Sequence, residues 1–146
     1  MRLDDIDRQL IDHLQGNART PWSELARTVG LSAPAVADRV KRLEDAGVIT
    51  GYHAHVDPDA LGYPLRAIVR LRPERNADVI GEYVAKEPAV LTAHRVTGAD
   101  CYVFDVVAEG KHDLAAFLDR LMEYGTVVTS VVLSSPVNHR VIVPPD

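Results

Sequence analysis

Residues 20–52 constrain the fold of this chain more than any other stretch. Within them, apolar side chains recur at spacings of three and four residues on two short segments, which Gly30 separates. Ser32 directly precedes the second segment, where its hydroxyl can accept a hydrogen bond from the first turn of a helix. Gly47 then ends that segment. The pattern predicts two amphipathic helices joined by a tight turn, and Pro21 is expected at the first helical position, after Thr20.

A third helix is predicted upstream of this pair. Ile6, Leu10 and Leu14 repeat at helical spacing after the acidic residues Asp4 and Asp5. A helix-turn-helix needs such a helix to complete its core. A generic helical hairpin would also produce the pair, but it leaves the upstream helix unexplained, so we favour the helix-turn-helix.

The polar face of the second helix of the pair carries small residues followed by basic ones. Because the first turns of a recognition helix contact base edges in the major groove, we expect this face to bind double-stranded DNA. Arg39 and Arg42 are expected to contact the DNA and Lys41 a phosphate. A charged face that is merely solvated is the alternative. The candidate DNA-binding residues are Ser32, Ala33, Pro34, Ala35, Asp38, Arg39, Lys41 and Arg42.

The net charge of the whole chain is −5, although proteins that bind nucleic acids are usually basic. The local field near Arg39, Lys41 and Arg42 matters more than this sum. A weakly basic unit should nevertheless bind DNA with modest affinity, so several copies are expected to act together in an oligomer.

The periodicity changes after the breakers Pro58, Gly62 and Pro64. We place the domain boundary near Leu61, which gives domains of residues 1–60 and 61–146, and we expect a strand over residues 48–57 to close the first domain as a wing. In the second domain the patterns predict, in order, a strand (65–72), a helix (77–87), two strands (89–97 and 101–109), a helix (112–125) and a strand (126–135).

This βαββαβ order indicates an α+β chain whose second domain is ferredoxin-like, with an antiparallel sheet and both helices on one face. The strands over 101–109 and 126–135 are rich in valine on both faces. The uncovered face of the sheet would therefore expose apolar surface, which pairing with a second copy would bury. The closing residues 139–146 are a candidate for a further edge strand across the dimer.

Several linked motifs resemble the Lrp/AsnC (leucine-responsive, or feast/famine) family of transcriptional regulators. They are LDDIDRQLIDHLQGNART, WSELARTVGLSAPAVADRVKRLEDAGVITGY, VDPDALGY and RVTGADCY, in that order. The resemblance implies a sequence-specific DNA-binding regulator with a winged helix-turn-helix. It also implies a homodimer that assembles into a tetramer or octamer, and an amino acid effector bound between dimers in the second domain.

Carried onto this chain, the resemblance places the effector at the loop between the second and third strands of the second domain and at the last strand. Gly98 would let backbone N–H groups approach a carboxylate, and Asp100 would pair with an ammonium group. An ordinary hairpin turn is the alternative for the bare residues. Many members of the family carry the acidic residue where this chain has Cys101. The candidate effector-binding residues are Thr97, Gly98, Ala99, Asp100, Cys101, Tyr102, Thr129 and Ser130.

Other classes of function find little support in the sequence. Cys101 is the single cysteine, so an intramolecular disulfide is excluded, and a buried core position is predicted for it rather than a nucleophile. His53 and His55 share one face of the expected strand and would hold a metal only with a third ligand. We expect no enzyme, cofactor or metal site. No apolar run long enough to span a membrane and no export signal is visible, so a cytoplasmic location is expected.

Overall fold

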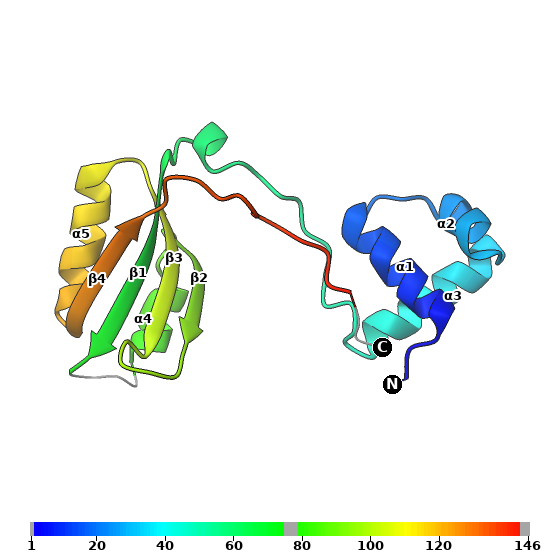
Figure 1. Cartoon of the computed structure of the whole chain (residues 1–146), viewed down its shortest axis with the longest axis horizontal. Coiled ribbons are helices and arrows are strands. Elements are labelled where there is room, and N and C mark those ends of the chain that lie inside the picture. The colour runs from blue at the N-terminus through cyan, green and yellow to red at the C-terminus, as the bar shows by residue number, and fades with distance from the viewer. Residues whose placement is uncertain (1, 75–78, 144–146) are drawn as a thin grey trace. The chain divides into compact units, whose positions relative to one another are not determined.

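The computed structural model of the chain describes residues 2–74 and 79–143, and these form two compact units (Figure 1). The first unit combines Met1–His55 with Val137–Asp146, and the second is Val56–Pro136. The division thus follows His55 rather than residue 60. It also groups the C-terminal segment with the first unit, whereas the sequence pattern favours the second domain.

Three helices make up the folded part of the first unit, as predicted. They are α1 (Asp5–Gly16), α2 (Trp22–Val29) and α3 (Ala33–Asp45). Ser32 caps α3, because its hydroxyl accepts a hydrogen bond from the Ala35 N–H at 3.3 Å. Gly30 ends α2 in the left-handed conformation (φ +70°), which favours glycine. Pro21 occupies the N-cap of α2 rather than its first helical position, so the helix begins later than predicted.

A small apolar core holds these helices together. The side chains that α3 buries lie at the predicted spacing of four and three residues, on the face turned toward α1 and α2. This core is formed by Leu10, Leu14, Leu25, Ala26, Val36 and Val40, with Ile6, Val29, Leu31, Ala33 and Ile49 packed against it.

The strand predicted over residues 48–57 is not formed, so the described part of the first unit has no wing strand. Instead, the N–H groups of Val48 and Ile49 donate to the Leu43 carbonyl at 2.9 and 3.2 Å, which continues the end of α3 as a turn. The Tyr52 hydroxyl donates to Glu44 at 2.8 Å. Alternating polarity alone was misleading here, because a strand also requires a neighbouring strand that supplies its hydrogen bonds.

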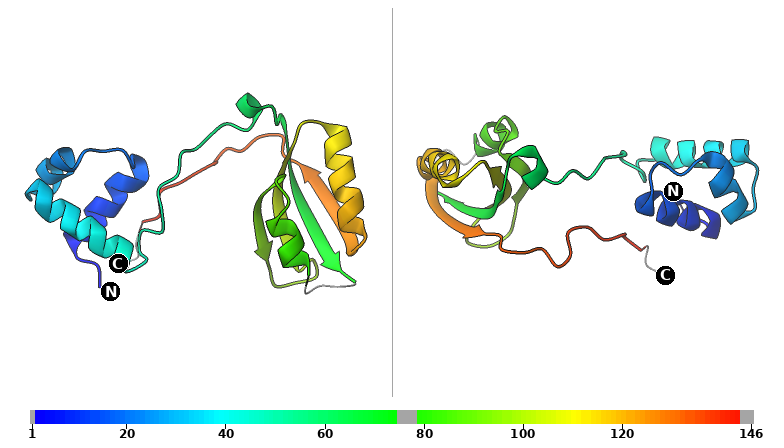
Figure 2. Two further views of the ribbon diagram at one scale, coloured as in Figure 1. Left: turned by 180° about the vertical axis from the view of Figure 1, so that it is seen from behind. Right: turned by 90° about the horizontal axis from the view of Figure 1, so that it is seen from above.

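The second unit has the predicted βαββαβ order. A 3-10 turn, η1 (Asp59–Leu61), precedes β1 (Leu65–Pro73), α4 (Ile80–Ala85), β2 (Val90–Arg95), β3 (Tyr102–Ala108), α5 (Lys111–Met122) and β4 (Gly125–Val131). The four strands form an antiparallel sheet in the order β2-β3-β1-β4. Both helices cover the same face of this sheet (Figure 2). The described part of α4 is shorter than the predicted helix 77–87, of which residues 77 and 78 lie outside the described residues.

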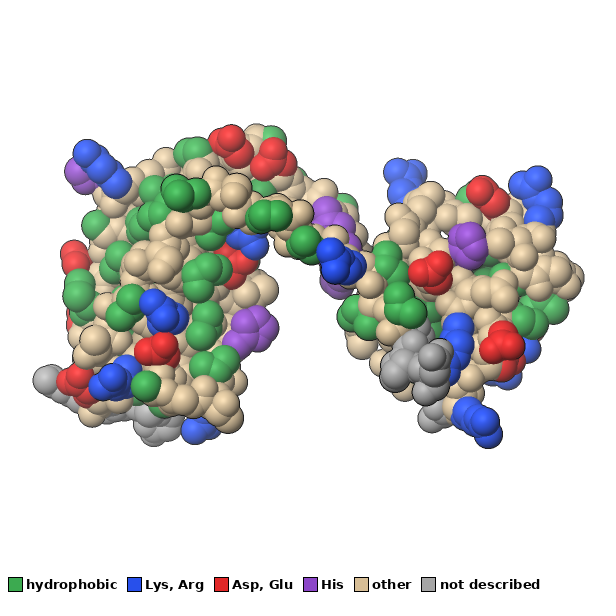
Figure 3. All heavy atoms as spheres, in the orientation of Figure 1, with side chains coloured by type: hydrophobic (Ala, Val, Ile, Leu, Met, Phe, Trp, Pro, Cys, Tyr) green, Lys and Arg blue, Asp and Glu red, His purple; other side chains and the backbone are tan. Residues whose placement is uncertain are grey.

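The two faces of the sheet differ in their surroundings. On the face toward the helices, Val69, Leu71 and Phe104 are completely buried and pack with α4 and α5. The opposite face, which we call the open face, carries apolar and charged side chains together (Figure 3). The strand register places Arg66, Ile68, Arg70, Val103, Asp105, Val128 and Ser130 on this open face.

Replacement of Phe104 by alanine should lower the free energy of unfolding of the second unit by about 3–5 kcal/mol, because it leaves a cavity in a fully buried site. Chemical denaturation of Phe104→Ala, followed by circular dichroism, measures this loss. The matched control is Met122→Ala, which removes an apolar side chain that is 53% exposed and should cost far less. Equal losses in the two variants would contradict the assignment of Phe104 to the core.

Candidate DNA-binding surface and ligand loop

The candidate DNA-binding face of α3 points away from the core. Val36, Val40 and Leu43 are buried on the inner side of the helix. Of the predicted residues, Ser32, Pro34, Asp38, Lys41 and Arg42 are exposed, whereas Ala33, Ala35 and Arg39 are partly buried.

The beginning of α3 is suited to close approach by another molecule. Ala33, Pro34 and Ala35 have short or compact side chains, so little covers the first turn. Because the N-terminus of a helix carries a partial positive charge, it favours anionic groups such as phosphates.

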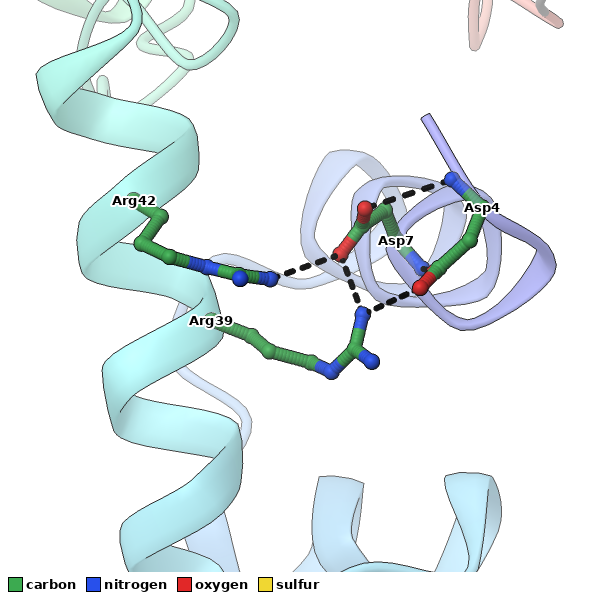
Figure 4. Close-up of polar contacts among 4 residues, drawn as sticks. All are labelled: Asp4, Asp7, Arg39 and Arg42. Atoms are coloured by element: carbon green, nitrogen blue, oxygen red, sulfur yellow. Dashed lines mark hydrogen bonds and ion pairs between the residues drawn. The ribbon is translucent and has the colours of Figure 1, made fainter. Parts of the chain in front are cut away.

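The two arginines of α3 are placed differently from each other (Figure 4). The Arg39 guanidinium points toward the start of α1, where Nη1 lies 2.7 Å from Asp4 Oδ2 and 2.8 Å from Asp7 Oδ1. The Arg42 side chain is 60% exposed, and its Nη2 lies 3.9 Å from the same oxygen of Asp7. The structure therefore brings Arg39 together with two carboxylates of its own unit, while Arg42 stays accessible.

Asp4 and Asp7 also cap α1. The Asp4 carboxylate accepts the Asp7 N–H at 2.8 Å, and the Asp7 carboxylate accepts the Asp4 N–H at 3.3 Å. The hydrogen bond from the Asp7 N–H lowers the pKa of Asp4 below its ordinary value, and the bond from Arg39 lowers it further. Hydrogen bonds to Asp4 and Asp7 in turn raise the pKa of Arg39, which stays charged.

Lys41 has a weaker local partner. Its ammonium lies 3.2 Å from Asp45, one turn later, and both side chains are about two thirds exposed. Exposed pairs of this kind contribute little to stability, so Lys41 can readily exchange Asp45 for a phosphate.

The candidate ligand loop joins β2 to β3 as a tight turn. The Val96 N–H donates to the Cys101 carbonyl at 2.7 Å. Gly98 has φ +114° and Cys101 has φ +61°, and open space lies where a Gly98 side chain would project. Cys101 is only partly buried and lies in the loop, directly before the start of β3. The prediction that Cys101 is a buried core residue of a strand is therefore wrong.

A charged pair links this loop to the open face of the sheet. Asp100 Oδ2 lies 3.8 Å from Nη1 of Arg70, which projects from β1. Both side chains are partly exposed, at 38% and 43%, so solvent reaches the pair.

The two hydroxyl residues of β4 lie on opposite faces. Thr129 is paired with Val69 on the helix-covered face, whereas Ser130 is paired with Ile68 on the open face. The structure therefore places Ser130, but not Thr129, on the same face as Arg70.

The histidines form no metal site among the described residues. His55 packs against His139 with 4.5 Å between ring centroids, and no group of three or more histidine, cysteine or acidic side chains suited to a metal is found in this part of the chain. No described helix has the length and apolar character that crossing a membrane requires.

Comparison with known proteins gives the same organisation. The model of the AsnC-type helix-turn-helix domain matches residues 3–44, and that of the Lrp/AsnC ligand binding domain matches residues 66–142. This chain belongs to the Lrp/AsnC family. As a member, it is a DNA-binding transcriptional regulator rather than an enzyme, and it carries the ligand-binding domain of that family.

Individual relatives of this Lrp/AsnC regulator match over nearly the whole chain. The transcriptional regulator YezC of Bacillus subtilis is 41% identical over 94% of the chain and 98% of its own length. The regulator LrpA of Mycobacterium tuberculosis is 34% identical over 97% of each protein.

Solved structures show the same fold as this Lrp/AsnC regulator. The structure of LrpC from B. subtilis is 31% identical, with a TM-score of 0.88 over 95% of this chain and 100% of that one. A feast or famine regulatory protein from M. tuberculosis, complexed with L-methionine, is 33% identical, with a TM-score of 0.91 over 98% and 100%.

The sequence of this Lrp/AsnC regulator does not reveal the partners of its predicted site residues. The Asp4–Asp7 spacing is that of a helix capping box, which was a usable signal. Nothing in the sequence pairs Arg39 with Asp4 and Asp7, or Arg70 with Asp100, because these partners are distant in the chain.

The capping carboxylate should make the first unit of the regulator sensitive to acid. A group whose pKa is lowered on folding stabilises the folded state above its unfolded value and loses this contribution as the pH falls. We therefore expect Asp4→Asn to flatten the loss of helical circular dichroism below pH 3.8, the ordinary value for Asp4. The exposed Asp5→Asn is the control, and an unchanged acid profile in Asp4→Asn would contradict the expectation.

Proposed function

We propose that this regulator recognises a specific double-stranded DNA operator through the exposed face of α3. Contacts are proposed from the first turn (Ser32, Ala33, Pro34 and Ala35), from Asp38, and from the cations Lys41 and Arg42. The exposure of this face, opposite the buried Val36, Val40 and Leu43, is the observation that carries the proposal. Because its proposed target is DNA, the regulator is proposed to act in the cytoplasm.

The chemistry of the surface divides this recognition into two parts. Small residues at the start of the helix permit close approach to base edges, and Ser32 and Asp38 offer polar atoms there. Lys41 and Arg42, about two turns later, are suited to the phosphate backbone. Because the chain as a whole is acidic, the affinity of a single unit should be modest, and simultaneous binding of several units raises it.

The open face of the sheet supports a homo-oligomer. Ile68, Val103 and Val128 lie there on three neighbouring strands, and Val128 is 44% exposed. Because exposed apolar surface favours association, a second copy packing on this face would bury it. We propose a homodimer that assembles further to a tetramer or octamer.

We also propose that an amino acid effector binds at the loop Thr97–Tyr102. The L-methionine complex of the related M. tuberculosis protein and the match to the family's ligand-binding domain support this class of ligand. Backbone N–H groups near Gly98 would bind the effector carboxylate, and Asp100 would bind its ammonium group.

At this site, the effector ammonium must compete with Arg70 for the Asp100 carboxylate. An incoming ammonium group must replace Arg70 as the partner of Asp100, or share the carboxylate with it. Ser130 lies on the same face as Arg70 and is the proposed hydroxyl ligand of β4, whereas Thr129 faces the helices. Ligand binding alters gene expression only if one assembly binds the effector better, typically by about 1–3 kcal/mol.

Replacement of Arg42 by glutamine should weaken DNA binding and reduce its salt dependence. Removing one interaction with a phosphate lowers the slope of log affinity against log salt by about one. Fluorescence anisotropy with a duplex that the wild-type protein selects from a random-sequence pool measures both quantities.

The control for Arg42→Gln is Lys111→Gln, which removes one exposed positive charge from the second unit. An identical salt slope in wild-type protein and Arg42→Gln would remove Arg42 from the proposed interface. Failure of the wild-type protein to select any duplex would contradict operator recognition itself.

Replacement of Asp100 by asparagine should abolish amino acid binding, because the amide carries no negative charge for the ammonium group. A thermal-shift screen against the twenty amino acids, with L-methionine first, identifies ligands of the wild-type protein, since a ligand of the native state raises the melting temperature. Isothermal calorimetry then compares Asp100→Asn with the exposed control Asp119→Asn. Undiminished binding in Asp100→Asn would place the ammonium group elsewhere.

A further inference from the structure

Arg39 lies on the recognition helix, yet its side chain is turned inward. Only 23% of the side chain is exposed, compared with 60% for Arg42, one turn further along α3. We propose that Arg39 is a positioning residue, which holds α3 at a fixed angle to α1 and does not itself contact bases or phosphates. This proposal rests on the proposed DNA-binding function of α3.

The contacts of the two carboxylates form a closed set (Figure 4). In Asp4, Oδ1 accepts the Asp7 N–H and Oδ2 accepts Arg39 Nη1. In Asp7, Oδ2 accepts the Asp4 N–H and Oδ1 accepts the same Arg39 nitrogen. Each of the four carboxylate oxygens thus has a donor, and Arg39 supplies positive charge at the centre of the set.

The burial of Asp7 makes the contribution of Arg39 difficult to replace. The Asp7 side chain is only 4% exposed, so water cannot readily take the place of the guanidinium. Removing one partner of a buried ion pair leaves an uncompensated charge, which is strongly unfavourable. If Arg39 turned toward DNA, the Asp7 carboxylate would keep the Asp4 N–H, but its nearest cation would be the more distant Arg42, at 3.9 Å.

The position of this cluster explains why it would affect DNA recognition. Val36 and Val40 of α3 pack with Leu10 and Leu14 of α1, one and two turns beyond Asp7. The ion pair adds a second contact at the N-terminal end of α1. Two separated contacts between a pair of helices restrict their crossing angle, whereas one contact leaves rotation possible. The orientation of the exposed face of α3 therefore depends on Arg39.

The test compares Arg39→Gln, Asp7→Asn and the double variant in the full-length protein. The probes are the duplex selected by the wild-type protein and a scrambled duplex of the same composition. We expect Arg39→Gln to lower the preference for the selected duplex at least tenfold, or about 1.4 kcal/mol, with an unchanged salt slope. The melting temperature of the first unit should fall as well.

The double variant separates positioning from direct contact. Two neutral amides can hydrogen-bond to each other without a buried charge, so Arg39→Gln with Asp7→Asn should recover part of the stability and preference that Arg39→Gln alone removes. A direct DNA contact cannot be recovered by a change at Asp7. Arg42→Gln serves as the reference for a phosphate contact, because it should lower the salt slope.

Three results would overturn the proposal. They are a salt slope reduced by about one in Arg39→Gln, an unchanged melting temperature in that variant, and no recovery in the double variant. If Arg39→Gln does not fold, Asp7→Asn decides: it removes the buried carboxylate and keeps Arg39, so positioning predicts a weaker preference, whereas direct phosphate contact predicts that the preference and the salt slope are retained. If the wild-type protein selects no duplex, DNA recognition fails as a function, while the melting temperatures still test the coupling of Arg39 to Asp7.

Discussion

The packing of the first unit depends on one buried carboxylate, that of Asp7. The Asp7 carboxylate helps to cap α1. Because this carboxylate is buried, it needs a nearby cation, and Arg39 of α3 supplies it. The apolar core of the unit is small, with Leu10 and Leu14 as the main contribution of α1. In so small a domain, a charged contact at one end of the helix packing has a large influence on helix orientation. The same constraint leaves Arg42 and Lys41, rather than Arg39, as the accessible cations of α3.

The second unit is governed by a different constraint, which is that two helices cover only one face of its sheet. Phe104, Val69 and Leu71 complete a core on the covered side. The open side combines Ile68 and Val128 with charged residues, so it is neither a typical solvent-exposed face nor a completed interior. Association through this face would join several DNA-binding units, and joined units compensate for the modest affinity expected of one acidic chain.

Local patterns predicted the elements well, because helices and hairpins depend on neighbouring residues. Ser32 and Gly30 marked helix ends correctly, and the βαββαβ order of the second unit followed from periodicity. The prediction of a strand over residues 48–57 was wrong, because alternating polarity does not supply a partner strand. The pairing of Arg39 could not be predicted from the sequence either, since its partners Asp4 and Asp7 lie more than thirty positions away in the chain. Residue type alone cannot distinguish an arginine that faces DNA from one that neutralises a buried acid.

The candidate ligand site shows the same dependence on distant partners. The sequence indicated a turn that contains Asp100, but it did not show that the Asp100 carboxylate already pairs with Arg70. An effector ammonium that took Asp100 would release a guanidinium onto the open face, beside Val103 and Val128, which are paired with Arg70 in the sheet. A newly unpaired charge on an apolar surface disfavours burial of that surface. Ligand binding and assembly would thus be coupled through one arginine.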